Sequence, residues 1–333
     1  MIRVACTLLA LAAIVPTCRA SDPSADELGQ LMATAARRFV EGLDESKRSQ
    51  AVFAFDSPER VNWHWIPRPR KGVPIKELSP DQRALAFGLL STGLSTKGNV
   101  KATTIMSLEE ILRVDEHGTG PVRDPELYYV SVFGTPGDDA GWGWRVEGHH
   151  LALNYTLKGN RVVSATPFMF GSNPAVVRKG PHKGLRNLAD IEAPVDALLA
   201  SMSGDQKKAA TVNPVAPDVT TTPNSAKLGR VEPEGIACDQ LTPAQRETLA
   251  QVVRAYAANF PPPIEALLLR ELEESEKSLH FAWYGPADRT KNHAFRIQGP
   301  ALFIDFNDTQ NDVNHIHTFY RGVADDFGPA AGK

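Results

Sequence analysis

The stretch of sequence that decides the fold is Trp144-Arg145-Val146-Glu147-Gly148-His149-His150-Leu151-Ala152-Leu153-Asn154-Tyr155. Residues that favour β-strands lie on both sides of its Gly-His-His sequence, and a glycine between two such runs is typical of a tight bend or a bulge. The second half of the chain contains a similar frame, Phe295-Arg296-Ile297-Gln298-Gly299 followed by Leu302-Phe303-Ile304-Asp305-Phe306. Both frames predict antiparallel strands.

Helix signals precede the two frames in the same order. Each half has a segment with Ser or Thr at a helix N-cap, Pro in the first turn and Gln three residues after the cap: Leu78-Ser79-Pro80-Asp81-Gln82-Arg83 and Leu241-Thr242-Pro243-Ala244-Gln245-Arg246. This pattern predicts a capping box, in which the cap and the Gln side chain each satisfy a backbone N–H of the other. Further upstream, apolar residues at helical spacing run from Leu28 to Phe39 and from Leu188 to Leu199.

These matches predict an α+β fold that is internally duplicated, because the strict alternation of strands and helices found in parallel sheets is absent. Each half is expected to contain two helices followed by antiparallel strands, and the halves are expected to pack with pseudo-two-fold symmetry. We place the first half at residues 21–180 and the second at residues 181–333.

Four of the nine histidines lie in two short clusters, His149-His150 and His315-Ile316-His317. Each cluster borders a strand-like run of a different half, so the predicted symmetry would bring the clusters together. His315 and His317 are two positions apart, and on a strand they would share a face. His149 and His150 are adjacent, so a regular strand would point them oppositely unless a bulge at Gly148 turned both inward.

The sequence therefore predicts that His149, His150, His315 and His317 hold a divalent metal ion. Imidazole nitrogens suit zinc, copper and iron, and nothing in the sequence chooses among them. The same histidines could instead form a metal-free, hydrogen-bonded binding or catalytic site, or they could be purely structural.

Two further residues are candidates for catalysis. Glu147 would share a strand face with His149 and could act as a general base or as a carboxylate ligand. Arg321 could clamp a carboxylate or a phosphate through its planar guanidinium. The alternative for Arg321 is a structural ion pair with Asp325 or Asp326.

Residues 1–20 predict a secretory signal peptide. Arg3 precedes an apolar stretch from Val4 to Val15, and cleavage after Ala20 would start the mature chain at Ser21. We therefore expect a periplasmic or extracellular protein. The apolar stretch is too short to cross a bilayer, and no other segment is apolar enough. Cleavage would leave Cys238 as the only cysteine, which excludes an internal disulfide and a thiolate metal cluster.

Charge and motifs exclude several classes of function. A net charge of −3 and a pI near 6.3 give no electrostatic footprint for nucleic acid. The run Arg68-Pro69-Arg70-Lys71 hints at a basic patch, but we interpret it as a solvated loop. The chain lacks the G-x-S-x-G nucleophile motif, a phosphate loop and a dinucleotide fingerprint, which argues against the corresponding chemistries.

Several distinctive motifs extend over nearly the whole mature chain: Arg123-Asp124-Pro125-Glu126-Leu127-Tyr128-Tyr129, Phe133-Gly134-Thr135-Pro136, Thr166-Pro167, Gly171-Ser172-Asn173-Pro174-Ala175, Phe281-Ala282-Trp283-Tyr284-Gly285 and Asn314-His315-Ile316-His317. With these motifs, and with the His149-His150 stretch, the chain resembles the secreted bacterial and fungal family known as domain of unknown function 3500. The resemblance implies an exported protein and implies no established activity.

Three functions follow from these observations. The first is a metal-dependent enzyme, a hydrolase or an oxidase, which requires a coordination position open to substrate. The second is a periplasmic protein that binds or handles a metal. The third is a metal-free module that binds a small acidic or sugar-like ligand in a pocket lined by Trp63, Trp65, Trp142, Trp144 and Arg321.

Overall fold

The computed structural model describes residues 24–217, 224–228 and 232–328. Within these ranges, eight α-helices lie against one mostly antiparallel sheet of thirteen strands, which confirms the predicted α+β class. The helices are α1 (Ala25–Gly42), α2 (Glu45–Ala51), α3 (Pro80–Thr92), α4 (Thr96–Asp115), α5 (Ala189–Ser201), α6 (Gly204–Ala210), α7 (Pro243–Ala257) and α8 (Pro262–Ser275). The strands are β1 (Val52–Phe53), β2 (Val73–Pro74), β3 (Tyr129–Phe133), β4 (Trp142–Gly148), β5 (Leu151–Lys158), β6 (Arg161–Ser164), β7 (Phe168–Ser172), β8 (Thr211–Asn213), β9 (Ile236–Ala237), β10 (His280–Tyr284), β11 (His293–Gln298), β12 (Leu302–Asp308) and β13 (Ile316–Gly322).

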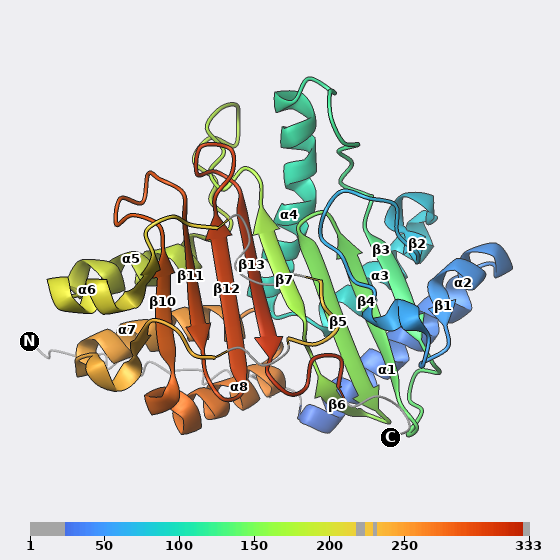
Figure 1. Cartoon of the computed structure of the whole chain (residues 1–333). Helices are drawn as coiled ribbons and strands as arrows, with labels where there is room; N and C mark the ends of the chain where they lie inside the picture. Colours follow the sequence, from blue (N-terminus) through green and yellow to red (C-terminus); the bar gives the residue numbers. More distant parts are fainter. Residues whose placement is uncertain (1–23, 218–223, 229–231, 329–333) are drawn as a thin grey trace, which may run out of the picture.

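The sheet is continuous across the whole described chain. Its strand order is β1-β3-β4-β5-β7-β13-β12-β11-β10-β8, and β2, β6 and β9 pair with β3, β5 and β10 beside this path. The central pair joins β7 to β13 in antiparallel register, from Ile316 opposite Ser172 to Tyr320 opposite Phe168. A strand from the middle of the sequence and a strand from near its C-terminal end therefore meet in the middle of the sheet (Figure 1).

The two faces of the sheet are covered differently. The long helices lie on one face, where they bury the main hydrophobic core (Figure 1). Non-helical segments cross the other face, and there Trp63 and Trp65 pack on Met169 of β7 and Phe319 of β13. Residues that alternate along β13 therefore point either into the helix-covered core or toward this second face.

The predicted capping boxes are confirmed. The Ser79 hydroxyl accepts the backbone N–H of Gln82, and the Gln82 side chain accepts the backbone N–H of Ser79. Thr242 and Gln245 form the same reciprocal pair at the start of α7. Such a box satisfies two donors that the first turn of a helix otherwise leaves unpaired.

The prediction of two helices before the strands of each half is wrong. In the described residues, α1–α4 precede β3 and α5–α8 precede β10. One of the additional helices, α4, contains Gly98 and several β-branched residues of low helix propensity, and burial of Ala102, Ile105 and Met106 in the core outweighs that propensity. The predicted signal peptide, residues 1–20, lies outside the described residues. None of the described helices is long and apolar enough to cross a membrane.

Candidate metal centre

The four predicted histidines meet where β7 and β13 join. Nε2 of His150 lies 2.8 Å from Nε2 of His315 and 3.2 Å from Nε2 of His317. The ring of His149 lies over that of His150, with 3.7 Å between the centroids and 31° between the planes. Residues from two distant parts of the chain thus form one histidine cluster, which we define as these four residues.

A tight turn positions the first two histidines. His149 and His150 connect β4 to β5, with Gly148 paired directly to Leu151. His150 has a φ of 61°, in the left-handed region of backbone conformation that residues other than glycine rarely adopt. Its backbone N–H donates to the carbonyl of Trp65 at 2.9 Å, which fixes the turn from outside. Because the pair occupies a turn and not a strand, both imidazoles lie on the same side.

Gly171 of β7 makes room for the ring of His150. A Cβ atom at this position would lie 2.8 Å from Cγ and Cδ2 of His150 and 2.8 Å from the carbonyl oxygen of Ile316. Both approaches are shorter than real Cβ contacts, so a side chain at position 171 would displace either the ring or the strand. The glycine also donates its N–H to the carbonyl of His150 at 2.8 Å, which ties the turn to β7.

The other two histidines lie at the start of β13. His315 directly precedes the strand, and its backbone N–H donates to Oδ1 of Asp308 at 2.9 Å. His317 lies opposite Asn307 of β12 and Gly171 of β7 in the sheet register. The rings of His315 and His317 are 4.6 Å apart, in agreement with the expectation that they share a side.

Burial keeps the inner imidazoles neutral. His149 is 8% exposed and His150 is 2% exposed. Burial holds the pKa of His149 well below its usual range, assisted by the charge of Arg123, and burial likewise holds the pKa of His150 far below that range. A neutral imidazole has a free nitrogen lone pair, which is the form that binds metals.

Glu109 is a buried partner of the cluster that sequence analysis missed. Its Oε1 forms a short hydrogen bond with Nδ1 of His149, and Nη1 of Arg123 lies 3.1 Å from the same nitrogen. Burial raises the pKa of Glu109 to about 8, against the opposing effect of Arg123. The available signal was its position on α4, because Glu109 follows Ile105 by four residues and precedes Leu112 by three, on the buried face.

Glu147 lies on β4 among arginines. Its Oε2 accepts the backbone N–H of His64 at 2.8 Å, and its Oε1 lies 3.2 Å from the guanidinium of Arg145. The Arg70 side chain is 4.0 Å away. Burial raises the pKa of Glu147, and the two arginines oppose that rise. A catalytic role for Glu147 stays a prediction.

Arg321 is also engaged by neighbours. Its Nε donates to Oδ2 of Asp326 at 2.7 Å, Nη2 donates to the carbonyl of Ser225 at 2.8 Å, and the guanidinium lies over the ring of Trp63. This geometry is that of the structural ion pair considered above. A catalytic role for Arg321 likewise stays a prediction.

The basic run at residues 68–71 is only partly a solvated loop. Arg68 is exposed, but the side chain of Arg70 is only 3% exposed. Arg70 donates to the carbonyls of His64, Ile66 and Gly148 at 3.2, 2.6 and 3.1 Å. This arginine fastens the segment that crosses the open face of the sheet to the end of β4, next to the histidine turn.

A cavity of about 330 Å³ reaches the cluster from this face. We call it the histidine cavity. It is lined by His64, Trp65, Ile66, Asn224, Asn307, Gln310, His317 and Phe319. Asn307 is 1% exposed, and neither its Nδ2 nor its Oδ1 has a hydrogen-bond partner among the described residues. Of the four tryptophans expected to line a ligand pocket, Trp65 is the one found here. Trp142 and Trp144 are buried in the helix-covered core instead.

Fold and cluster together define an α+β protein with a buried group of histidines, His149, His150 and His315 among them, that could hold a metal ion. The model of one family, described as protein of unknown function (DUF3500), matches residues 26–329, and the chain belongs to that family. Neither the curated proteins nor the solved structures contain a match to the chain.

Proposed function

We propose that the histidine cluster binds one divalent transition-metal ion through Nε2 of His150, His315 and His317. The observation that carries the proposal is the convergence of these three ring nitrogens, at 2.8 and 3.2 Å from His150, out of segments 165 residues apart. Two nitrogens that each lie about 2.0–2.1 Å from one ion are about 2.9 Å apart when the angle at the ion is 90° and about 3.4 Å apart when it is tetrahedral. The observed separations of 2.8 and 3.2 Å are close to these values. A set of imidazole nitrogens favours zinc or copper over magnesium or calcium.

His149 offers a fourth nitrogen. The ligand atoms of His149, His150 and His315 all lie within 4.8 Å of one another, whereas two ligands of one ion are at most about 4.2 Å apart, so His149 joins after a small shift of its ring. Glu109 supports this role, because its hydrogen bond with Nδ1 of His149 fixes the orientation of the ring. Carboxylates in this position commonly orient metal-binding histidines.

The histidine cavity favours an ion that small molecules can reach. His317 belongs to both the cluster and the cavity wall, and the amide of Asn307 next to it is buried without a partner. A buried amide of this kind is usually satisfied by water or by a ligand. We therefore favour a metal-dependent enzyme, a hydrolase or an oxidase, with a metal-handling protein as the alternative.

Metal analysis tests the binding site. Protein purified without a histidine tag should carry about one equivalent of zinc, copper or iron by plasma mass spectrometry. A His315→Ala/His317→Ala variant should carry almost none and retain its circular-dichroism spectrum. The matched control is His117→Ala/His182→Ala, which removes two exposed histidines. Equal metal content in all three proteins, or no metal in any after soaking and desalting, contradicts the proposal.

A second experiment separates the enzyme from the metal-handling protein. Cobalt(II) loaded into the site gives an absorption spectrum that reports on its ligands, and azide is a small anion that occupies open coordination positions. An enzyme with an accessible ion should show a saturable spectral change with azide. A spectrum that does not respond indicates a closed site and favours metal handling.

We further propose that the chain arose by duplication. The order of helices and short strands in α1 to β7 parallels that in α5 to β13. The sheet order also reads symmetrically outward from the β7–β13 pair, with a parallel β1–β3 pairing near one end and a parallel β8–β10 pairing at the other. We also propose that the protein is exported to the periplasm or out of the cell, which rests on the predicted signal peptide at residues 1–20.

A further inference from the structure

A second cavity lies near the other end of β13, on the helix-covered side of the sheet. Its volume is about 410 Å³, and it is enclosed by α8, β6 and the segment that follows β13. Strand β13 reaches this cavity with Tyr320 and Gly322, whereas His317 of the histidine cluster lies near the opposite end of the same strand. We call this space the α8 cavity.

One wall of the α8 cavity is an apolar face of a single helix. Ile264, Leu267, Leu268 and Glu271 follow the i, i+3, i+4, i+7 pattern that places residues on one side of a helix. Phe260, just before α8, extends the same wall. Leu267 is 49% exposed, so this face is not fully covered by the rest of the molecule. The apolar wall can accept an alkyl chain.

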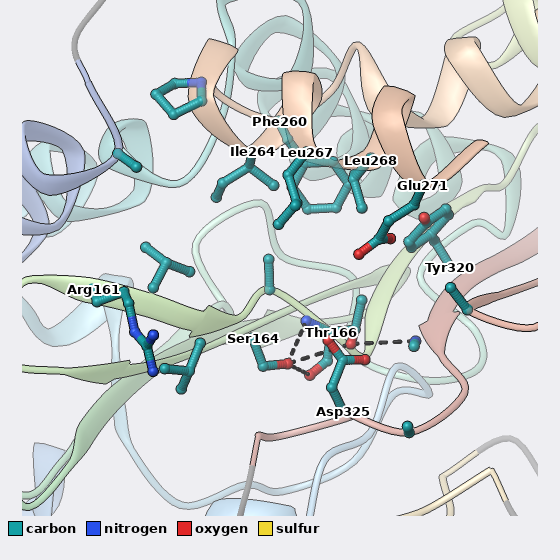
Figure 2. Close-up of a pocket in the computed structure, with 18 of the residues that line it drawn as sticks. Arg161, Ser164, Thr166, Phe260, Ile264, Leu267, Leu268, Glu271, Tyr320 and Asp325 are labelled. Carbon is teal, nitrogen blue, oxygen red and sulfur yellow. Dashed lines mark hydrogen bonds between the residues drawn. The ribbon is translucent and has the colours of Figure 1, made fainter. Parts of the chain in front are cut away.

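Two carboxylates define the other end of the cavity. Figure 2 shows Glu271 from α8 and Asp325 from the opposite wall on either side of the space, with Tyr320 beside Glu271. No Lys or Arg of the described residues forms an ion pair with either carboxylate. Arg161, the cation among the lining residues, lies at the opposite end of the view. Burial raises the pKa of Glu271, and the charge of Asp325 adds to the rise.

Tyr320 supplies an independent indication of a ligand. The residue is 2% exposed and lines the α8 cavity, yet its hydroxyl makes no hydrogen bond to a described residue. The hydroxyl is not among the fully buried polar atoms, so it is accessible from the cavity and can pair with a ligand there. Glu271 and Asp325 are both close enough to influence the phenol electrostatically. A cationic donor at this end would face two carboxylates and a phenol oxygen at once.

We propose that the α8 cavity binds a cationic amphiphile, a short alkyl chain ending in a protonated amine, with the chain along α8 and the ammonium group between Glu271, Asp325 and Tyr320. An ammonium group offers three hydrogen-bond donors, which matches these three acceptors. Its charge also relieves the repulsion between the two carboxylates. The site is separate from the metal centre and does not depend on it.

Calorimetric titration with three probes of equal chain length tests the proposal: n-octylammonium, n-octanol and octanoate, each below its micelle concentration. Octylammonium should bind at least ten times more tightly than octanoate, with octanol between them. Glu271→Gln/Asp325→Asn should weaken octylammonium at least tenfold and leave octanol nearly unchanged. Glu273→Gln, at an exposed position on the same helix, is the matched control and should bind like the wild type.

The His315→Ala/His317→Ala variant should bind octylammonium as the wild type does, so failure of the metal proposal and failure of this one are distinguishable. Absence of binding by any probe, a preference for octanoate, or octylammonium binding that the two carboxylate changes do not affect would each overturn the proposal. The single variants Glu271→Gln and Asp325→Asn keep the test valid if the double variant is unstable.

Discussion

Glu109 is a side chain whose role in the site sequence analysis could not have assigned. Its carboxylate is separated from His149 by 40 positions in the sequence but forms a short hydrogen bond with it. A charged residue on the buried face of a helix costs folding free energy unless it is paired, so its presence indicates a partner. No pattern within α4 identifies that partner as a histidine on a distant turn.

Glu109→Gln should lower metal affinity by roughly 10–100-fold, the usual effect of losing a carboxylate that orients a metal-binding histidine. The neutral amide keeps the size of the side chain, so the fold should persist. Competition with a chelator of known affinity measures the change. Glu110→Gln, which alters the exposed neighbour paired with Arg113, is the control. Equal affinities for the wild type and Glu109→Gln would remove Glu109 from the site.

His293 makes a pH-dependent contribution to stability that is unrelated to the cluster. Its ring stacks on Trp283 at 5.4 Å, Nδ1 hydrogen-bonds to the carbonyl of Lys291, and burial lowers its pKa to about 4. In the unfolded chain the imidazole titrates near 6.5. The unfolded state therefore binds more protons between pH 6.5 and 4, and this contribution is complete above pH 6.5 and is lost as the pH falls toward 4.

His293→Phe keeps the stacking and removes the titration. Between pH 7 and pH 4.5, the free energy of unfolding of the wild type should fall by about 2–3 kcal/mol more than that of the variant, as urea titrations at the two values would show. His182→Phe, at an exposed position, should follow the wild type. Parallel curves for the wild type and His293→Phe would show that the ring is not buried in its neutral form.

At the scale of elements, the segment over the open face holds the histidine turn in place. Arg70 reaches three carbonyls, and the carbonyl of Trp65 accepts the N–H of His150. Lysine carries the same charge but lacks the forked donors of arginine. Arg70→Lys should therefore loosen the segment and speed hydrogen exchange at the amide of His150 by tenfold or more.

Exchange measured by NMR or mass spectrometry on the peptide that contains His150 provides the readout. Arg68→Lys changes an exposed arginine of the same run and should leave the exchange rate unchanged. If the amide of His150 exchanges at the same rate in both variants, the segment is fixed by Trp63 and Trp65 and not by Arg70.

Helices and strands could be predicted from the sequence where residues close together in the chain determine them. The capping boxes at Ser79 and Thr242 depend on residues three apart, and both form as expected. The strand frames also depend on short-range alternation, and β4, β5, β11 and β12 follow them. Helix α4 was missed because its stability comes from contacts with the sheet and not from its own composition. The side-by-side placement of β7 and β13 was expected only through the inferred symmetry, since pairing between distant strands leaves no local signal.

At the scale of the whole molecule, the proposed ion links the middle of the sequence to its C-terminal part. Its ligands come from the β4–β5 turn and from the start of β13, which lie on either side of β7 in the sheet. An ion that binds only the folded state stabilises it by about 2.7 kcal/mol at a free concentration one hundred times its dissociation constant. Adding the native metal should therefore raise the melting temperature of the wild type in proportion to the logarithm of its concentration.

Scanning calorimetry of metal-free and metal-loaded protein measures this effect. His315→Ala/His317→Ala should show the same melting temperature with and without metal. His117→Ala/His182→Ala should respond like the wild type. A rise of equal size in all three proteins would indicate non-specific binding to the surface.

The distance in sequence between His150 and His315 has a consequence for the order of events during synthesis. These residues are 165 positions apart, and ribosomes add about 5–20 residues per second, so roughly 8–33 s separate the appearance of the first ligands from that of the last. Throughout that interval the emerging chain carries an incomplete set of nitrogens, and it cannot retain an ion with full affinity. Loading is thus a late step that follows the synthesis of β13, and the presence of the ion would mark a molecule in which β13 has joined the β4–β5 turn.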